Sequence, residues 1–301
     1  MTDDIVKDYR GRFAPSPTGA LHFGSLVAAI GSYLDARKNN GAWLVRMEDI
    51  DPPREVAGAA DDILKTLELF GFEWDEPVMY QSRRHDIYND AIESLSEKEF
   101  VYACTCSRKE ISSAGKPGLE GTIYPGTCRY AGNKFNKEHA VRVITPKLRL
   151  TFEDRLQGLK TCNLHDEIGD FVLRRRDGLF AYQLAVVVDD AEQNITDIVR
   201  GSDLLLSTFR QIHLQSMLGI DRVDYCHLPI AVNEKGEKLS KQTSAPPLDK
   251  KNPVSELVRA MMFLGYKVPK AVSKGDLDQF WTWALKTWDL RKLVKNEAIA
   301  C

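Results

Sequence analysis

Apolar residues recur along the N-terminal third of the chain with the spacings of alternating strands and helices. A short strand is predicted at 10–14, before a turn containing proline and glycine, and the compact apolar run at 42–47 has the length of a buried strand. At 24–39, 55–70 and 85–98 the apolar residues instead fall three and four positions apart, which predicts helices. Because strands and helices alternate, we expect βαβ units with a parallel sheet, and therefore an α/β fold.

The amino-acid composition changes at Tyr102. From there to Tyr130 the chain is rich in Cys, Gly, Ser and Pro. Further strands are predicted at 140–144, 148–152 and 195–200, a helix at 205–218, a polar lysine-rich loop at 233–244, and helices after Pro253. These changes predict four parts: a first half of the core at 1–101, an insertion at 102–180, a second half of the core at 181–245, and a helical C-terminal region at 246–301.

Composition and charge limit the classes of function. The 301 residues are 43% hydrophobic and 28% charged, as in ordinary globular proteins, and the formal net charge is -2. That charge argues against a surface that is basic throughout, but it allows a local basic stripe that contacts nucleic acid. The N-terminus lacks the apolar segment of a signal peptide, and no apolar stretch reaches the length of a membrane span. We therefore expect a cytoplasmic protein with no membrane partner.

The segment from Arg12 to Ser25, RFAPSPTGALHFGS, is typical of a phosphate-binding site. A strand ends, a turn follows, and a helix begins at about Gly24. The N-terminus of a helix offers free N–H groups and positive partial charge to a phosphate. Gly24 would let a nucleotide approach the backbone, and His22 and Ser25 could donate hydrogen bonds. Since the chain has neither a P-loop motif nor a GxGxxG after its first strand, γ-phosphoryl transfer and a dinucleotide cofactor are disfavoured.

A second candidate segment is KLSKQ, residues 238–242 of the lysine-rich loop. Taken alone, it is best interpreted as a solvated basic loop. Together with the first segment it gains a function, because positive charge placed where charge develops is a large catalytic effect. We predict that ATP is bound by His22, Gly24, Ser25, Lys238, Ser240 and Lys241, with His22, Gly24, Lys238 and Lys241 as the catalytic set.

Three of the six cysteines are clustered, at Cys104, Cys106 and Cys128. In a reducing compartment this clustering favours a metal over a disulfide. Zinc prefers four tetrahedral ligands, so a fourth ligand is needed. His139 is a candidate on general grounds, and three thiols without a metal are the alternative.

The HFGS and KLSKQ segments resemble the two signatures of class I aminoacyl-tRNA synthetases. RFAPSPTGALHFGS, VRMEDIDPPR, LELFGFEWDE and YQLAVVVDDAEQNITDIVRGSDLLLSTFRQ narrow the resemblance to the glutamyl/glutaminyl branch, over residues 10–245. Ser25, Leu239 and Gln242 depart from the signatures, although Ser25 keeps a hydroxyl and Lys241 is retained. The resemblance implies a Rossmann-type nucleotide-binding sheet, and attack of an amino-acid carboxylate on the α-phosphate of ATP, with Mg²⁺ neutralising the pyrophosphate.

The same resemblance implies a glutamate pocket. Arginine pairs well with carboxylates, and Arg12 and Arg200 each lie at the end of a predicted strand. Glu48 follows the apolar run and could bind the ammonium, and Tyr182 adds a hydroxyl. The implied pocket residues are Arg12, Phe13, Ala14, Pro15, Ser16, Glu48, Tyr182 and Arg200. The resemblance also implies Zn²⁺ held by Cys104, Cys106, Tyr124 and Cys128 in an inserted subdomain.

Only 59 residues (301 − 242) follow Gln242, too few for the helical domain with which glutamyl synthetases read the anticodon. The sequence therefore resembles a shortened paralogue of that branch. This resemblance implies activation of glutamate without tRNA, then transfer of glutamate to queuosine at the wobble position of tRNA(Asp). The anticodon stem-loop would be the partner, with Arg174, Arg175, Arg176 and the lysines at 235–241 as candidate phosphate contacts. An exposed run of charge is the alternative interpretation of these residues. We expect a monomer.

Three alternatives remain open at this point. The first is a truncated glutamyl-tRNA synthetase that charges tRNA(Glu), and the second is a ligase that transfers activated glutamate to a small amine or alcohol. The third is a catalytically inactive, zinc-containing RNA-binding module, which the presence of His22, Lys238 and Lys241 disfavours. Glutamate-dependent ATP–pyrophosphate exchange in the absence of tRNA distinguishes the first and third from our reading.

Overall fold

The computed structural model describes residues 8–136, 138–233 and 246–300, and the predicted βαβ unit is present at its start. Strand β1 (Arg10–Phe13) pairs in parallel with β2 (Ala42–Met47), and helix α1 (Phe23–Lys38) connects them. β3 (Met79–Tyr80) extends this sheet in parallel, and α3 (His85–Glu97) follows. The elements expected at 10–14, 24–39, 42–47 and 85–98 are thus confirmed to within a residue at each end.

The helix expected at 55–70 begins later than predicted. Helix α2 spans Ala59–Leu69, after a 3-10 turn at Pro52–Arg54. Two features hold the intervening residues out of a helix. The Val56 N–H donates to the Pro17 carbonyl (3.0 Å), and Gly58, at the N-cap, has φ +77°. A left-handed residue cannot continue a right-handed helix, so the prediction for 55–58 was wrong.

The second half of the core repeats the alternating pattern. Helix α5 (Tyr182–Glu192) leads to β11 (Asp197–Gly201), and α6 (Ser207–Leu218) leads to β12 (Asp224–Leu228). β11 and β12 are parallel, and the Thr196 N–H donates to the Arg10 carbonyl (3.0 Å), which places β11 beside β1. The predicted strand at 195–200 and helix at 205–218 are confirmed with ends shifted by one or two residues. A mixed α/β fold with parallel strands is therefore confirmed.

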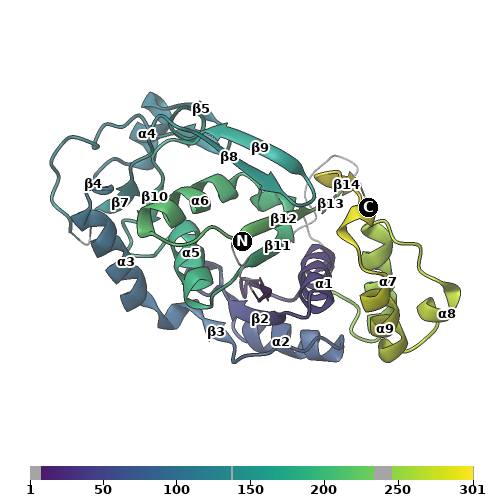
Figure 1. The fold of residues 1–301 in the computed structure, drawn as a ribbon. Helices are drawn as coiled ribbons and strands as arrows, with labels where there is room; N and C mark the ends of the chain where they lie inside the picture. The colour runs from purple at the N-terminus through teal and green to yellow at the C-terminus, as the bar shows by residue number, and fades with distance from the viewer. Residues whose placement is uncertain (1–7, 137, 234–245, 301) are drawn as a thin grey trace, which may run out of the picture.

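Residues 101–174 contain a separate antiparallel sheet, in the order β10 (Val172–Arg174), β7 (Ala140–Val143), β4 (Val101–Cys104). Helix α4 (Arg108–Ala114) and the hairpin of β5 (Lys116–Gly118) and β6 (Gly121–Ile123) lie beside it (Figure 1). A second hairpin, β8 (Arg149–Asp154) and β9 (Gly158–Asn163), joins β12 in parallel at Tyr225 and Asp154. The core sheet thus extends into the predicted insertion.

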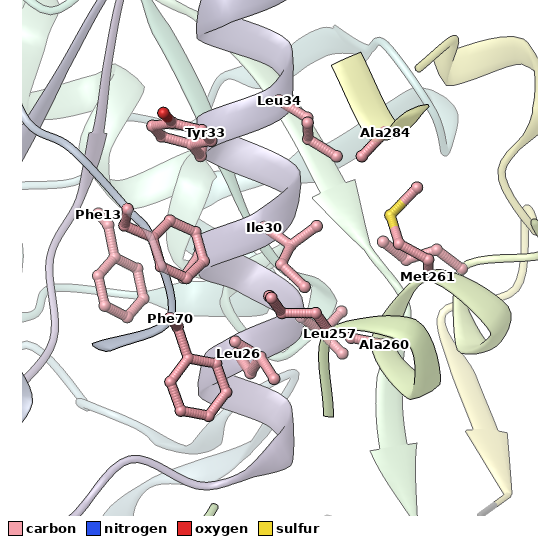
Figure 2. Packing of buried hydrophobic residues seen from close by; sticks show 14 of the residues in the cluster. Phe13, Leu26, Ile30, Tyr33, Leu34, Phe70, Leu257, Ala260, Met261 and Ala284 are labelled. Atoms are coloured by element: carbon pink, nitrogen blue, oxygen red, sulfur yellow. The ribbon is translucent and has the colours of Figure 1, made fainter. Parts of the chain in front are cut away.

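The C-terminal region is helical, as expected, and packs on α1 (Figure 1). It contains α7 (Pro253–Phe263), α8 (Lys270–Ser273) and α9 (Leu277–Thr287). Leu257 and Met261 lie against Ile30 and Leu34 in one buried cluster (Figure 2). β14 (Ala298–Ala300) pairs in parallel with β13 (Ile230–Val232). None of the helices in the described ranges is both long and apolar enough to span a membrane.

Candidate active site

A cavity of about 500 Å³ opens at the C-terminal ends of the parallel strands. Its walls come from the ends of β1, β11 and β12, the residue after β2, the N-terminus of α5, and the turn that leads into α1. The predicted residues that line it are Arg12, Phe13, Ala14, Pro15, Ser16, His22, Gly24, Ser25, Glu48, Tyr182 and Arg200. The structure thus brings the predicted glutamate-pocket residues together with three of the predicted ATP residues, His22, Gly24 and Ser25. Lys238, Ser240 and Lys241 lie outside the described residues.

The N-terminus of α1 forms one side of this cavity. His22 is the N-cap, and its Nδ1 accepts a hydrogen bond from the Ser25 N–H (3.3 Å). Since Nδ1 is the acceptor, the proton of a neutral ring sits on Nε2, which makes Nε2 a donor. Gly24 lines the cavity beside His22 without a side chain. A helix N-terminus, a histidine donor and a bare backbone together suit a phosphate chain.

Arg12 is neutralised by a direct ion pair. Its Nε lies 3.1 Å from Oδ1 of Asp190, and Arg46 Nη2 lies 2.7 Å from the same oxygen. Arg46 Nη1 also donates to Gln193 Oε1 (2.7 Å). Burial opposes ionisation of Asp190, but Arg12 and Arg46 outweigh it and hold its pKa below the usual range. One carboxylate therefore fixes two guanidinium groups, that of Arg12 in the cavity wall and that of Arg46, which does not line the cavity.

Glu48 is the buried acid of the cavity. Its Oε1 has no hydrogen-bond partner in the described part of the chain, and it lies 3.8 Å from Arg46 Nη2. Burial raises the pKa of Glu48 to about 7, against the opposing effect of Arg46 and Arg12. A buried carboxylate with an unused acceptor is well suited to bind an ammonium group, since pairing relieves its desolvation.

Arg200 is held differently from Arg12. Its Nη2 donates to Thr208 Oγ1 (2.8 Å) and the Leu204 carbonyl (3.2 Å), and its Nε donates to His227 Nε2 (3.1 Å). Nη1 has only the Tyr182 hydroxyl, at 3.4 Å. Among the residues that the structure describes, no carboxylate forms an ion pair with Arg200, so its charge is available to an anionic ligand.

The partners of these arginines were not predicted. Each of these partners is brought to its arginine only by the fold, and no local pattern links the two: Asp190, Arg46, His227 and Asp154. Asp190, for example, follows Arg12 by 178 positions. One signal was present in the sequence. The run VVVDD places Asp189 and Asp190 inside an apolar helix, and both are buried.

The three clustered cysteines converge in the structure. The Sγ atoms of Cys104, Cys106 and Cys128 lie within 4.8 Å of one another. The Tyr124 hydroxyl lies 3.4 Å from Cys104 Sγ and 3.3 Å from Cys106 Sγ. Burial alone would raise the pKa of the Cys128 thiol, but hydrogen bonds from Tyr124 and Thr105 lower it to about 6. The three thiols and the phenol together offer four ligand atoms to a metal ion.

The other candidate ligand and the three arginines lie elsewhere. His139 Nδ1 contacts the Lys134 carbonyl (3.0 Å), and this histidine is not part of the cysteine cluster among the described residues. The predicted phosphate contacts lie at the end of β10 and directly after it, and all three bond within the chain. Arg174 donates to Asn136, Arg175 pairs with Asp51 and Asp177, and Arg176 donates to Glu138 and Thr105.

Comparisons with known proteins agree with this geometry. Residues 8–270 match the family model of class I tRNA synthetases (E and Q), catalytic domain. The chain resembles a solved glutamate-tRNA synthetase from Elizabethkingia anophelis with a TM-score of 0.79 at 24% identity, over 96% of this chain and 67% of that one. This similarity shows the fold. The class is therefore that of the class I synthetases specific for glutamate and glutamine.

Curated relatives narrow the family further. A protein of Chromobacterium violaceum named glutamyl-Q tRNA(Asp) synthetase is 55% identical over 95% of each chain. One of the same name from Dechloromonas aromatica is 57% identical over 97% of each chain. The chain belongs to the glutamyl-Q tRNA(Asp) synthetase family within the class I tRNA synthetases.

Proposed function

We propose that this protein activates glutamate with ATP as glutamyl-adenylate and then transfers the glutamyl group to the queuosine base of tRNA(Asp). The observation that carries the proposal is the pairing of two features in one cavity. The N-terminus of α1 offers a phosphate site. In the same cavity, among the described residues, Glu48 has an oxygen without a hydrogen-bond partner and Arg200 has no carboxylate partner. The family membership and the names of the relatives support the same substrates.

ATP would lie with its phosphates at the N-terminus of α1. Gly24 leaves room for the phosphate chain, and His22 Nε2 donates to a phosphate oxygen. We propose that Lys238, Ser240 and Lys241 also hold the triphosphate. Mg²⁺ would arrive with the nucleotide and neutralise the leaving pyrophosphate.

Glutamate would lie between the acidic and basic groups of the cavity. Its ammonium pairs with Glu48, and its side-chain carboxylate pairs with Arg200 Nη1 and the Tyr182 hydroxyl. The α-carboxylate then faces the α-phosphorus. A bond forms between a carboxylate oxygen and phosphorus while the bond to pyrophosphate breaks. No side chain of the protein becomes covalently attached, so positioning and electrostatics supply the rate.

We propose that the cluster of Cys104, Cys106, Cys128 and Tyr124 holds one Zn²⁺ with a structural role. In a tetrahedral site with Zn–S bonds of about 2.3 Å, sulfur atoms lie about 3.8 Å apart. The 3.5 Å between Cys106 and Cys128 and the 4.8 Å limit for the three sulfurs fit such a site. Bound zinc would fix the loops around β4, and it would take no part in the chemistry.

Two assays test the proposed function. Glutamate-dependent ATP–pyrophosphate exchange without tRNA should be present, which tests activation. Radiolabelled glutamate should then be incorporated into tRNA(Asp) that carries queuosine and not into tRNA(Asp) without it. Equal labelling of both tRNAs, or labelling of tRNA(Glu) instead, would refute the proposed acceptor while leaving activation in place.

A further inference from the structure

Arg200 stands at the end of a buried chain of three side chains from three neighbouring strands. Arg200 Nε of β11 donates to Nε2 of His227 in β12 (3.1 Å), and His227 Nδ1 lies 2.6 Å from Asp154 Oδ2 in β8. The three residues are 4%, 0% and 2% exposed. Asp154 and His227 lie behind Arg200 and do not line the cavity.

The chemistry of Arg200 determines the tautomer of His227. An arginine Nε always carries its hydrogen, so the Nε2 atom that faces it must be the acceptor. The proton of the neutral ring is therefore on Nδ1, from which it is donated to Asp154. Burial lowers the pKa of His227 to about 4, which agrees with a neutral ring.

Asp154 is well placed to hold this tautomer. Its Oδ1 accepts the backbone N–H groups of Leu156 (3.0 Å) and Gln157 (2.8 Å). Burial would raise the pKa of Asp154, but His227 and these backbone groups lower it below the usual range. The carboxylate is thus ionised, fixed at several points, and able to fix the imidazole in turn.

His227 and Asp154 offset the charge of Arg200 without contacting its Nη1 atom. Arg12 forms a direct ion pair, in which its Nε lies 3.1 Å from Oδ1 of Asp190. Arg200 meets its carboxylate only through an imidazole, so the Asp154 charge offsets burial of the guanidinium at a distance. Nη1, the nitrogen beside Tyr182 at the cavity, stays available to a ligand.

We propose that His227, held as its Nδ1–H tautomer by Asp154, is a positioning residue that directs Arg200 Nη1 at the side-chain carboxylate of glutamate. This inference rests on the proposed function and adds to it a residue that positions Arg200. His227 would set the affinity and selectivity for the amino acid, whereas ATP would be bound independently.

Matched substitutions of His227 test the inference through pyrophosphate exchange without tRNA. In His227→Asn the amide reaches about as far as Nδ1, so it can serve Asp154 but leaves Arg200 Nε without an acceptor. In His227→Gln the amide oxygen reaches about as far as Nε2 and can accept from Arg200. Loss of a hydrogen bond to a charged group corresponds to roughly a 10- to 100-fold effect. We expect His227→Asn to raise the KM for glutamate by about that factor with the KM for ATP unchanged, and His227→Gln to restore most of the affinity.

His213 provides the matched control. It is also a buried histidine that lies outside the cavity, and among the described residues its ring bonds only to the Ile144 carbonyl (2.9 Å). His213→Asn should lower thermal stability to a similar extent and leave the KM for glutamate unchanged. If His227→Asn is folded and keeps the wild-type KM for glutamate, or if the KM for ATP rises equally, the inference is wrong.

A second measurement requires neither activity nor a variant that folds well. In the ¹⁵N NMR spectrum of histidine-labelled wild-type protein, His227 should show a protonated Nδ1 and an unprotonated Nε2, the tautomer that free histidine populates less. The opposite tautomer, or a charged ring at pH 7, would overturn the inference even if exchange succeeds. Absence of exchange in the wild type, with the expected tautomer, would instead refute the proposed function.

Discussion

Replacing Glu48 by glutamine should make the protein more stable and its binding of glutamate weaker. The buried carboxyl has a pKa of about 7 in the folded chain against an ordinary value of 4.5. The difference between these two pKa values, at about 1.36 kcal/mol per pKa unit, corresponds to a free energy of about 3 kcal/mol. It is the free energy by which ionised Glu48 disfavours folding at a pH above 7.

The sign of the pH effect follows from proton binding. Between pH 4.5 and 7 the folded chain retains a proton on Glu48 that the unfolded chain has lost, so the contribution of Glu48 to stability falls as the pH rises through this window. Glutamine resembles the neutral acid at every pH. Glu48→Gln should therefore raise the free energy of unfolding by up to about 3 kcal/mol at pH 8 and change it little at pH 4. Urea unfolding at both pH values measures this difference.

Binding of glutamate should respond in the opposite way, because the ammonium needs the ionised form of Glu48. With a pKa of about 7, only about a tenth of Glu48 is ionised at pH 6. The wild-type KM for glutamate in exchange should therefore be about tenfold higher at pH 6 than at pH 8. Glu48→Gln should raise the KM at pH 8 and remove this pH dependence.

Glu256→Gln is the control for both measurements, because Glu256 lies on α7 away from the cavity and pairs with Arg259 (3.3 Å). It should leave the pH profile of the KM as in the wild type. The reasoning fails if Glu48→Gln keeps the wild-type KM and pH profile. It fails equally if the variant is no more stable than the wild type at pH 8.

Arg200→Lys should raise the KM for glutamate at least about tenfold without changing the KM for ATP. The reason is that a lysine ammonium cannot bond to His227, Thr208 and a ligand carboxylate together. An unchanged KM for glutamate in exchange assays would contradict the proposed pocket. Cys106→Ser should reduce the zinc content well below one equivalent, and metal analysis that finds a full equivalent would remove Cys106 from the ligand set. Leu257→Ala, in the fully buried contact of α7 with α1, should lower the free energy of unfolding by about 2–5 kcal/mol. A loss below about 1 kcal/mol in urea unfolding would contradict that packing.

The elements that periodicity predicted well are those with one apolar face or a continuous apolar run. β2, with the sequence AWLVRM, and α1 were predicted nearly to the residue. β12 was missed because its sequence, DYCHL, begins with an exposed aspartate and carries a buried histidine, so it is not a continuous apolar run. The polar residue that obscures the strand is His227, which is buried for its hydrogen bonds and not for its hydrophobicity. The start of α2 was missed because it depends on a left-handed glycine.

The same distinction separates the predicted part of the site from the part that was missed. The cavity residues lie in short segments where residue type and order identify a turn, a helix start or a strand end. Asp190 and Asp154 act through partners that are 178 and 73 positions away, so no local pattern links them. The residues that line the cavity can be predicted from local patterns, whereas the residues that hold them in place are visible only in the fold.

Those distant partners have a consequence for how the pocket forms. Arg12 and Arg46, from the first half of the core, depend on Asp190 of α5, from the second half. Arg200, from the second half, depends through His227 on Asp154, which the predicted insertion supplies on β8. Each cation would be buried at considerable expense if its partner were absent. The arginines therefore acquire their geometry only when all three parts of the chain are packed, because the same buried interactions that join the parts also determine which charges face the cavity.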